Sequence, residues 1–281
     1  MPSVPSIAAI PTLIWSASTA IEKGISVRFG TALTSLMIVG LGIIPMLIYY
    51  LIHPIQISFY YSILSALSGL FFACGALLYY KTLETEQVSN TVASGFVQPA
   101  LILAFSILIL HETVSIFQAI SGVIIVSGVL LVITTKNLKV NVKILPAVLA
   151  NASWGIYWII ASTAILGANT IGMTLLISRT STFAVLLIAF FLFLRTKSAG
   201  KIGNKLIMLV AIAGILDGFG NLFFGFLVSQ NLVAVAAIFN TAQPILVTGI
   251  AYLFMKERLT KIQGAGMALA VIGALSLALA I

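Results

Sequence analysis

Long runs of apolar residues follow one another along the chain, with only short polar segments between them. A helix needs about 20 apolar residues to cross the roughly 30 Å hydrocarbon core of a bilayer. At that length the pattern predicts ten membrane-spanning helices, over residues 6–22, 30–51, 57–79, 87–110, 114–134, 144–166, 170–194, 205–229, 232–255 and 261–280. We therefore expect an all-α integral membrane protein.

The composition points to the same class of protein. Of the 281 residues, 61% are apolar and 7% are charged, whereas a soluble globular chain carries about 25% charged residues. The net charge of +8 is spread thinly over 14 Lys and Arg residues, so we expect no nucleic-acid partner. The single cysteine, Cys74, excludes a disulfide framework and a cysteine-ligated metal site.

The basic residues lie almost entirely in the loops on one side of the predicted helices. These residues are Lys23, Arg28, Lys81, Lys136, Lys139, Lys143, Arg195, Lys197, Lys201, Lys205, Lys256, Arg258 and Lys261. The opposite loops carry no Lys or Arg, and Arg179 falls inside a span. Because cytoplasmic loops are enriched in Lys and Arg, we expect the basic loops in the cytoplasm, both termini outside, and an inner (plasma) membrane location.

The two halves of the chain repeat each other. A shift of 145 positions aligns Gln98-Pro99 with Gln243-Pro244, Glu112 with Glu257, and Gly128 with Gly273. This predicts a first five-helix repeat over 1–135, a basic linker over 136–143 and a second five-helix repeat over 144–281. Five crossings are an odd number, so the second repeat would be inverted relative to the first. Inverted repeats with a site at the midplane between them recur among secondary transporters.

Short motifs in each half resemble those of a known family. They are Gln98-Pro99, His111-Glu112-Thr113, Gly122 and Gly128 in the first half, and Gln243-Pro244, Lys256-Glu257-Arg258-Leu259-Thr260, Gly264, Gly266 and Gly273 in the second. With the repeat and the helix count, the chain resembles the drug/metabolite transporter superfamily, and within it the EamA-like permeases. The resemblance implies a 5+5 inverted repeat and transport of small organic solutes, such as amino acids, nucleotide sugars or sugar phosphates.

Arg179 and Asp217 are the ionisable residues deepest within the predicted spans. A charge at the bilayer centre costs at least about 2.5–3.5 kcal/mol, so each needs a partner or a water-filled cavity. In a substrate site, Arg179 would bind a carboxylate or phosphate, and Asp217 would contact an amine or carry a proton. The alternative is a permanent buried ion pair. Asn221, one helical turn beyond Asp217, is expected to share the same cavity.

Two prolines, Pro99 and Pro244, stand mid-span at equivalent positions of the repeat. Each removes one backbone hydrogen bond, so both helices are expected to bend. Beside the bends lie the uncharged hydrogen-bonding side chains Gln98, Asn240 and Gln243. Two roles stay open for them: coordinating the substrate or bridging helices.

Aromatic and polar stripes mark two of the predicted helices. Trp154 and Trp158 share one face of the helix over 144–166, and this face is expected to turn inward. A place at the membrane interface is the alternative for Trp154 and for Trp15. The helix over 6–22 carries a similar stripe, made of Trp15, Ser18, Thr19 and Glu22. Glu22 is expected at the interface, paired with Lys23, while Glu112 and Glu257 are expected to cap helices.

These features together predict a secondary active transporter. It would move a small polar organic solute, amino-acid-like or an anionic metabolite, across the bilayer by alternating access, with proton coupling left open. A multidrug or organic-cation exporter is the alternative. A channel is a weaker alternative, because one deep cation and one deep anion do not form a ring of charge or a carbonyl filter.

An enzyme is not expected, because Asp217 is the only aspartate and the chain has only 2 His residues. The sequence contains no phosphate-binding loop, so ATP drive within this chain is not expected. We expect no cofactor. The expected partners are the small-molecule substrate and the lipid bilayer, with protons as a further option, and both a monomer and a homodimer stay open.

Overall fold

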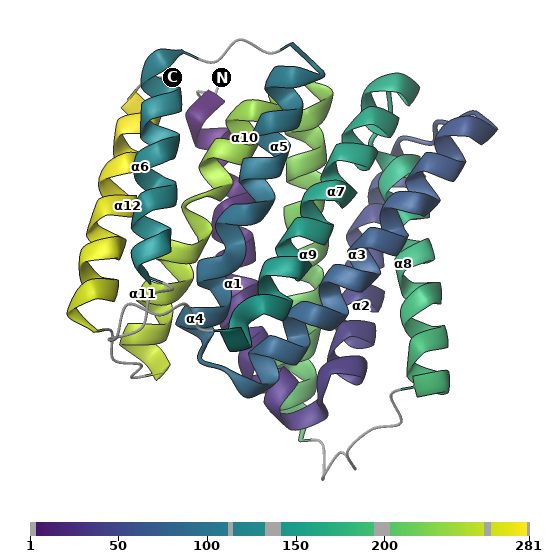
Figure 1. The fold of residues 1–281 in the computed structure, drawn as a ribbon. Helices are drawn as coiled ribbons and strands as arrows, with labels where there is room; N and C mark the ends of the chain where they lie inside the picture. The colour runs from purple at the N-terminus through teal and green to yellow at the C-terminus, as the bar shows by residue number, and fades with distance from the viewer. Residues whose placement is uncertain (1–3, 112–114, 133–141, 194–202, 256–259, 280–281) are drawn as a thin grey trace.

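The computed structural model describes residues 4–111, 115–132, 142–193, 203–255 and 260–279, which form helices joined by turns and short extended segments (Figure 1). The α-helices are α1 (Val4–Phe29), α2 (Thr31–Ile52), α3 (Phe59–Thr85), α4 (Val88–Val92), α5 (Val97–Leu108), α6 (Ile116–Val132), α7 (Leu145–Ala168), α8 (Gly172–Phe193), α9 (Asn204–Ser229), α10 (Val233–Asn240), α11 (Gln243–Met255) and α12 (Lys261–Leu279). Two short 3-10 helices are η1 (Ala93–Phe96) and η2 (Val142–Ile144).

Helices suit this sequence because a bilayer offers no water to bond the backbone, so every N–H and C=O group must pair inside the chain. Polar side chains within the helices are satisfied locally. The Ser35 hydroxyl, for example, donates to the Thr31 carbonyl at 2.8 Å, and the Thr182 hydroxyl donates to the Ser178 carbonyl at 2.9 Å. Such bonds let hydroxyl side chains sit within apolar helices.

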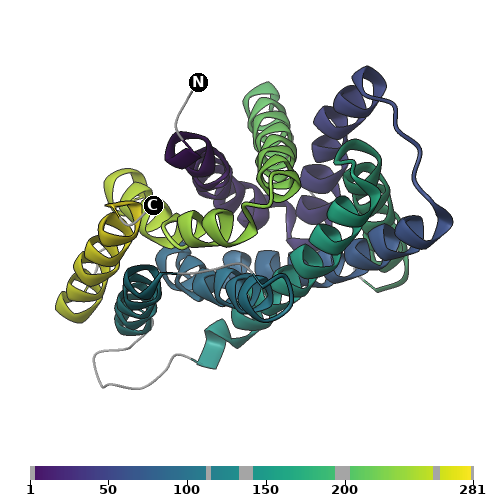
Figure 2. The same ribbon diagram turned by 90° about the horizontal axis from the view of Figure 1, so that it is seen from above.

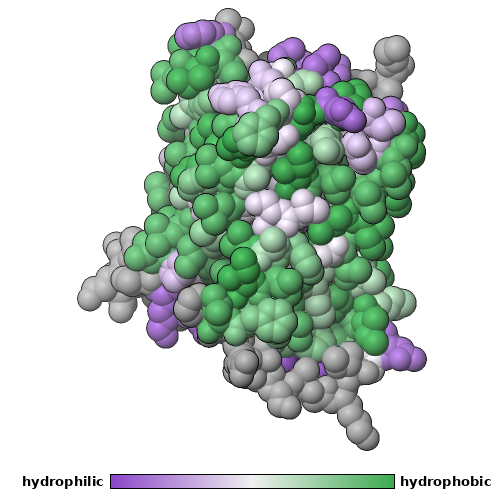
Figure 3. Space-filling model, turned by 90° about the vertical axis from the view of Figure 1, so that its right-hand side faces the viewer, coloured by the Kyte–Doolittle hydropathy of each residue, from purple (hydrophilic) through white to green (hydrophobic). Residues whose placement is uncertain are grey.

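Within the part of the chain that the structure describes, six helical segments are long and apolar enough to cross a bilayer. They are Thr31–Ile52, Phe59–Thr85, Leu145–Ala168, Gly172–Leu192, Asn204–Ser229 and Val233–Met255. Shorter apolar helices cover Ala119–Gly128 and Gly264–Gly273. Hydrophobic side chains cover most of the face shown in Figure 3, between hydrophilic residues toward its two ends. Phe59, which is 82% exposed, and Leu253, which is 71% exposed, are typical of large apolar side chains that face outward and would contact lipid.

Two of the expected continuous helices are interrupted. The expected single helix over 87–110 is instead α4, η1 and α5 in succession, and the Ser94 hydroxyl bonds the Thr91 carbonyl at 2.7 Å within this break. The expected helix over 232–255 divides into α10 and α11. At this second break, the N–H groups of Thr241 and Ala242 bond carbonyls only three residues back, at 3.1 Å each. Each break comes within two residues of a Gln-Pro pair that follows it, and the proline of that pair cannot donate a backbone hydrogen bond to the preceding turn.

The helices pack in a pattern that pairs elements from the two halves. α3 packs against α7 and α8, while α9 packs against α1 and α2. α6 packs mainly against α12. This pair lies at one lateral side of the bundle, on the left in both views (Figures 1 and 2). The core between α1, α3, α7 and α9 includes Phe72, Tyr157, Trp158 and Phe224.

Candidate functional site

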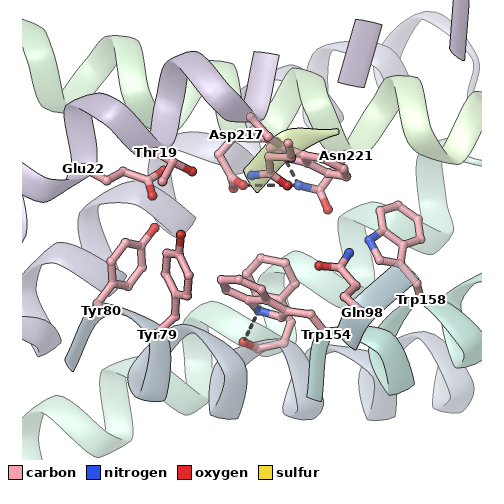
Figure 4. A pocket seen from close by; sticks show the side chains of 12 residues that line it. Thr19, Glu22, Tyr79, Tyr80, Gln98, Trp154, Trp158, Asp217 and Asn221 are labelled. Carbon is pink, nitrogen blue, oxygen red and sulfur yellow. Dashed lines mark hydrogen bonds between the residues drawn. The ribbon is translucent and has the colours of Figure 1, made fainter. Parts of the chain in front are cut away.

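A small cavity lies between α1, α3, α5, α7, α9 and α11 (Figure 4). It measures about 60 Å³, which is room for a few water molecules. Its walls combine aromatic rings, two carboxyl groups and several amides. The lining residues are Trp15, Thr19, Glu22, Phe72, Tyr79, Tyr80, Gln98, Trp154, Trp158, Asp217, Asn221 and Gln243.

Asp217 in α9 is joined to Arg179 in α8. The Arg179 Nη2 atom donates to the Asp217 Oδ2 atom at 2.6 Å. The arginine side chain is fully buried, whereas the aspartate side chain keeps 13% of its surface exposed. Asp217 therefore borders the cavity, while Arg179 stands behind it and is not among the lining residues.

Asn221 holds the other oxygen of the same carboxylate. Its Nδ2 atom lies 3.3 Å from the Asp217 Oδ1 atom and donates to the Asp217 backbone carbonyl at 2.8 Å. The Tyr157 hydroxyl in turn donates to the Asn221 Oδ1 atom at 3.1 Å. The expectation that Asn221 and Asp217 share one face of a helix thus agrees with their positions in the structure.

Arg179 also packs against an aromatic ring of α3. Its guanidinium carbon lies 3.9 Å from the centroid of the Phe72 ring, a geometry that stabilises a cation against the ring face. Among the residues that the structure describes, the Arg179 Nε and Nη1 atoms have no hydrogen-bond partner. Arg179 therefore bridges α9 and α3 through one ion pair and one ring.

The structure brings together most of the other sequence-predicted site residues. Gln98, Gln243, Trp154 and Trp158 all line the cavity. The Trp154 Nε1 atom donates to the Phe72 backbone carbonyl at 3.3 Å. Asn240 is the exception, because it is buried but does not line the cavity.

The tryptophans belong to a network of rings. Trp158 lies 4.1 Å from Phe224 and 6.4 Å from Trp15, measured between ring centroids. Trp154 lies 4.9 Å from Tyr79 and 5.7 Å from Phe72 by the same measure. Both sequence-predicted tryptophans therefore lie within this network of rings and line the cavity.

Glu22 is buried inside the helix bundle and is not paired with Lys23 as the sequence suggested. Only 5% of its surface is exposed, and its Oε1 atom accepts a hydrogen bond from the Ser18 hydroxyl at 2.6 Å. Lys23 instead donates to the backbone carbonyls of Leu83 and Glu86 at the end of α3. Glu22 is thus a second carboxyl group in the cavity. The expected caps Glu112 and Glu257 lie outside the described residues.

A family model for the EamA-like transporter family matches residues 4–134 and again residues 141–279. The chain belongs to the EamA-like transporter family. Members of this family transport small solutes across membranes, so the chain is a multi-pass membrane protein of a transporter family and not of an enzyme family.

A similar solved structure supports the fold of this EamA-like transporter. That crystal structure shares 17% sequence identity with the chain, with a TM-score of 0.72, and the match covers 96% of this chain and 94% of the other. At this identity the likeness concerns the fold alone. No curated protein matches the chain.

Both ranges of this EamA-like transporter that match the family supply helices to the cavity. α1, α3 and α5 come from the first matched range, and α7, α9 and α11 come from the second. Gln98 and Gln243 stand at equivalent positions of the repeat, and so do Phe72 and Asp217. The cavity therefore lies where corresponding parts of the two halves meet.

Several lining residues were not singled out as site residues from the sequence. They are Trp15, Thr19, Glu22, Phe72, Tyr79 and Tyr80. The available signal was the spacing of Trp15, Thr19 and Glu22, which are four and three residues apart and so share one face of a helix. No such signal marked the α3 residues, because α3 is rich in apolar and aromatic residues on every face.

Proposed function

We propose that the chain is a secondary transporter that moves a small polar organic solute by alternating access, with the solute bound in the cavity between the two halves. The observation that carries this proposal is that α1, α3 and α5 of one half face α7, α9 and α11 of the other around one polar, aromatic space. Opening that space to either side requires the halves to move relative to each other, because about 60 Å³ holds only water.

The proposal includes ten membrane crossings in two inverted five-helix repeats. Each half then contributes five equivalent elements, with α4, η1 and α5 forming one broken crossing and α10 and α11 another. The packing supports this layout, since α3 contacts α7 and α8 as α9 contacts α1 and α2. Discontinuous helices beside a central site are a common feature of transporters built from inverted repeats.

The proposed orientation has the basic loops in the cytoplasm of a plasma (inner) membrane and both termini outside. α1 and α3 end, and α7, α9 and α12 begin, at the same end of the molecule (Figure 1). Basic residues close to these helix ends include Arg28, Lys81, Lys143, Lys205 and Lys261. The start of α1 and the end of α12 both lie at the opposite end (Figure 1), which supports an even number of crossings.

The surroundings of Arg179 favour some solutes over others. Its guanidinium is engaged by Asp217 at 2.6 Å and by the Phe72 ring at 3.9 Å and does not line the cavity, so an anionic solute in the cavity would meet the Asp217 carboxylate before it met Arg179. The groups that border the cavity are carboxyl, amide, hydroxyl and indole groups. This set suits a solute that carries an amine, amino-acid-like or an organic cation, better than an anionic metabolite.

Ligand-dependent thermal unfolding of the detergent-purified protein tests the proposed site. A ligand that binds only the folded state stabilises it by RT ln(1 + [L]/Kd). With a panel of amino acids, organic acids, sugar phosphates and organic cations, we expect amine-bearing compounds to raise the unfolding temperature. The shift should disappear in Gln98→Ala and persist in Ser127→Ala, which lies on α6 outside the cavity.

A shift that survives Gln98→Ala and Trp158→Ala would locate the binding site elsewhere. Stabilisation by phosphates alone, lost in Arg179→Gln, would contradict the amine class and return the guanidinium to the role of substrate anchor.

A further inference from the structure

The Glu22 carboxyl group is buried in the cavity without a basic partner in the part of the chain that the structure describes. The ion pair there joins Arg179 to Asp217. Lys23, the nearest basic residue in sequence, is turned to the carbonyl groups that end α3. The Glu22 Oε1 atom accepts a hydrogen bond from the Ser18 hydroxyl at 2.6 Å. The same hydroxyl oxygen lies 3.0 Å from the Ala213 backbone carbonyl oxygen.

The titratable and charged groups around Glu22 come from several helices. Tyr79 and Tyr80 of α3 point their hydroxyl groups toward Glu22 and Thr19 (Figure 4). From α9 comes Asp217, the second carboxyl group of the cavity, with Arg179 of α8 behind it. Since the arginine offsets the Asp217 charge, an ionised Glu22 would leave the site with one uncompensated negative charge. Within a bilayer such a charge requires a cation or a proton.

The walls of the cavity suit a cation with an apolar exterior. The rings of Trp15, Phe72, Tyr79, Trp154 and Trp158 line it, and aromatic faces attract substituted ammonium groups through their negative quadrupole. The structure already holds one cation in this way, since the Arg179 guanidinium lies over the Phe72 ring. Once the two halves move apart and enlarge the cavity from about 60 Å³, a carboxylate at one end and rings along the sides would form a cage for a positively charged head group.

We infer that Glu22 is the binding carboxylate for a substituted ammonium ion, and that a proton takes its place when the ammonium ion is absent. This inference rests on the proposed transport function and names its substrate class. In the exchange, the O–H bond of the Glu22 carboxylic acid breaks and its proton passes through cavity water to the open side. The ammonium ion then binds the carboxylate without forming a covalent bond. One monovalent cation replaces one proton, so the exchange is electroneutral.

Proton release on ligand binding measures this exchange directly. The probe is tetramethylammonium, whose fixed charge cannot gain or lose a proton, so any proton released comes from the protein. It is added to the purified protein in weakly buffered detergent solution, and binding is followed in parallel by calorimetry. We expect close to one proton released per tetramethylammonium ion bound at acidic pH. Release should fall toward zero as the pH rises and Glu22 ionises beforehand.

Variants of Glu22 test whether the released proton comes from this residue. Glu22→Gln should lose proton release and at least 10-fold in tetramethylammonium affinity. Glu84→Gln is the matched control, because Glu84 accepts a hydrogen bond from Thr31 at 3.0 Å outside the cavity lining, and it should behave like the wild type. Glu22→Asp keeps the carboxyl group, so it should keep proton release with a shifted pH profile. This variant tests the inference if Glu22→Gln does not fold.

Infrared difference spectroscopy of the wild type gives a second readout, in which tetramethylammonium should remove a protonated-carboxyl band. Wild-type binding without proton release, or proton release kept in a folded Glu22→Gln, would overturn the inference. Neither result would contradict solute transport, which is tested separately by counterflow. Absence of tetramethylammonium binding to the wild type would overturn this inference, whereas the amine class of solute is tested by the thermal-unfolding panel.

Discussion

Asp217 organises the polar groups on the α9 side of the cavity. One carboxylate oxygen accepts from Arg179 at 2.6 Å, and the other lies 3.3 Å from the Asn221 amide. The Tyr157 hydroxyl donates a hydrogen bond to the Asn221 Oδ1 atom at 3.1 Å. Because the arginine is fully buried, this chain of contacts also keeps a cation stable inside an apolar bundle. The pair therefore acts on stability as well as on the charge of the site.

Removing one partner of the Arg179–Asp217 ion pair should lower the free energy of unfolding more than removing both partners. Asp217→Leu leaves a buried guanidinium without its counter-ion, and we expect a loss of about 3–5 kcal/mol in the free energy of unfolding. The double variant Arg179→Met with Asp217→Leu removes both charges and should recover most of that loss. Unfolding in detergent, followed by temperature or denaturant, measures the two. Equal stabilities for the single and the double variant would show that the ion pair does not act as a unit.

The sequence predicted one of the two cavity carboxyl groups and misplaced the other. Arg179 and Asp217 stood out because a charge deep in a span must find a partner, and the pair was one of the alternatives. Glu22 was assigned to Lys23 because the two are adjacent in sequence. Neighbours on a helix point about 100° apart, so Lys23 reaches the end of α3 while Glu22 faces the cavity. Which residues a helix face contacts depends on how the helices pack, and the spacing of residues along the sequence does not specify that packing.

Glycines set how closely pairs of helices approach. In the α6–α12 pair, a Cβ atom added at Gly128 would lie 2.5 Å from the Ala270 backbone nitrogen, and one added at Gly273 would lie 2.9 Å from the Ile125 backbone nitrogen. The two glycines are equivalent in the repeat. Small residues at such crossings allow backbones to come together without a hydrophobic driving force.

Gly128→Ala should therefore destabilise the α6–α12 pair by about 1–3 kcal/mol, because the new methyl group meets backbone that cannot move aside locally. Gly122→Ala on the same helix is the matched control, since nothing lies within 4 Å of its added Cβ atom. The control should be neutral or slightly stabilising, because alanine favours a helix over glycine. Thermal unfolding compares the two, and an equal effect of both substitutions would contradict close packing at Gly128.

Helix positions were more predictable than helix continuity. The prolines near the starts of α5 and α11 indicated bends, yet the structure has interruptions just before both helices. A single missing donor bends a helix, but here the turns before the prolines also tighten to bonds three residues long, as at Thr241. In the other direction, the expected span over 6–22 is part of a helix that continues to Phe29. A polar residue ends an apolar run without ending the helix that carries it.

At the scale of the whole molecule, two similar halves meet around a site that is not itself symmetric. Phe72 and Asp217 occupy equivalent positions, and both contact Arg179, one through its ring and one through its carboxylate. The repeat was visible in the sequence from Gln-Pro pairs and glycines. The asymmetry of the charged groups depends on which side chains the folded halves bring together, and that information is not local to either half.

The proposed orientation predicts which ends of the helices face outward. In a Cys74→Ser background, a cysteine at His53, next to the end of α2, should react with a membrane-impermeant maleimide added to intact cells. A cysteine at Lys143, at the start of α7, should react only after the cells are opened. The reverse labelling pattern would invert the orientation, and labelling of both positions from outside would contradict an odd number of crossings between them.

The central claim is that two halves of the molecule alternately open one cavity to the two sides of the membrane. Counterflow in proteoliposomes tests it most directly, with the purified protein and an amine-bearing solute that stabilises it in thermal unfolding. We predict that unlabelled solute inside the vesicles accelerates and transiently concentrates labelled solute from outside, with saturation at high concentration. A flux that rises linearly with concentration and is indifferent to solute on the far side would contradict alternating access and indicate a channel.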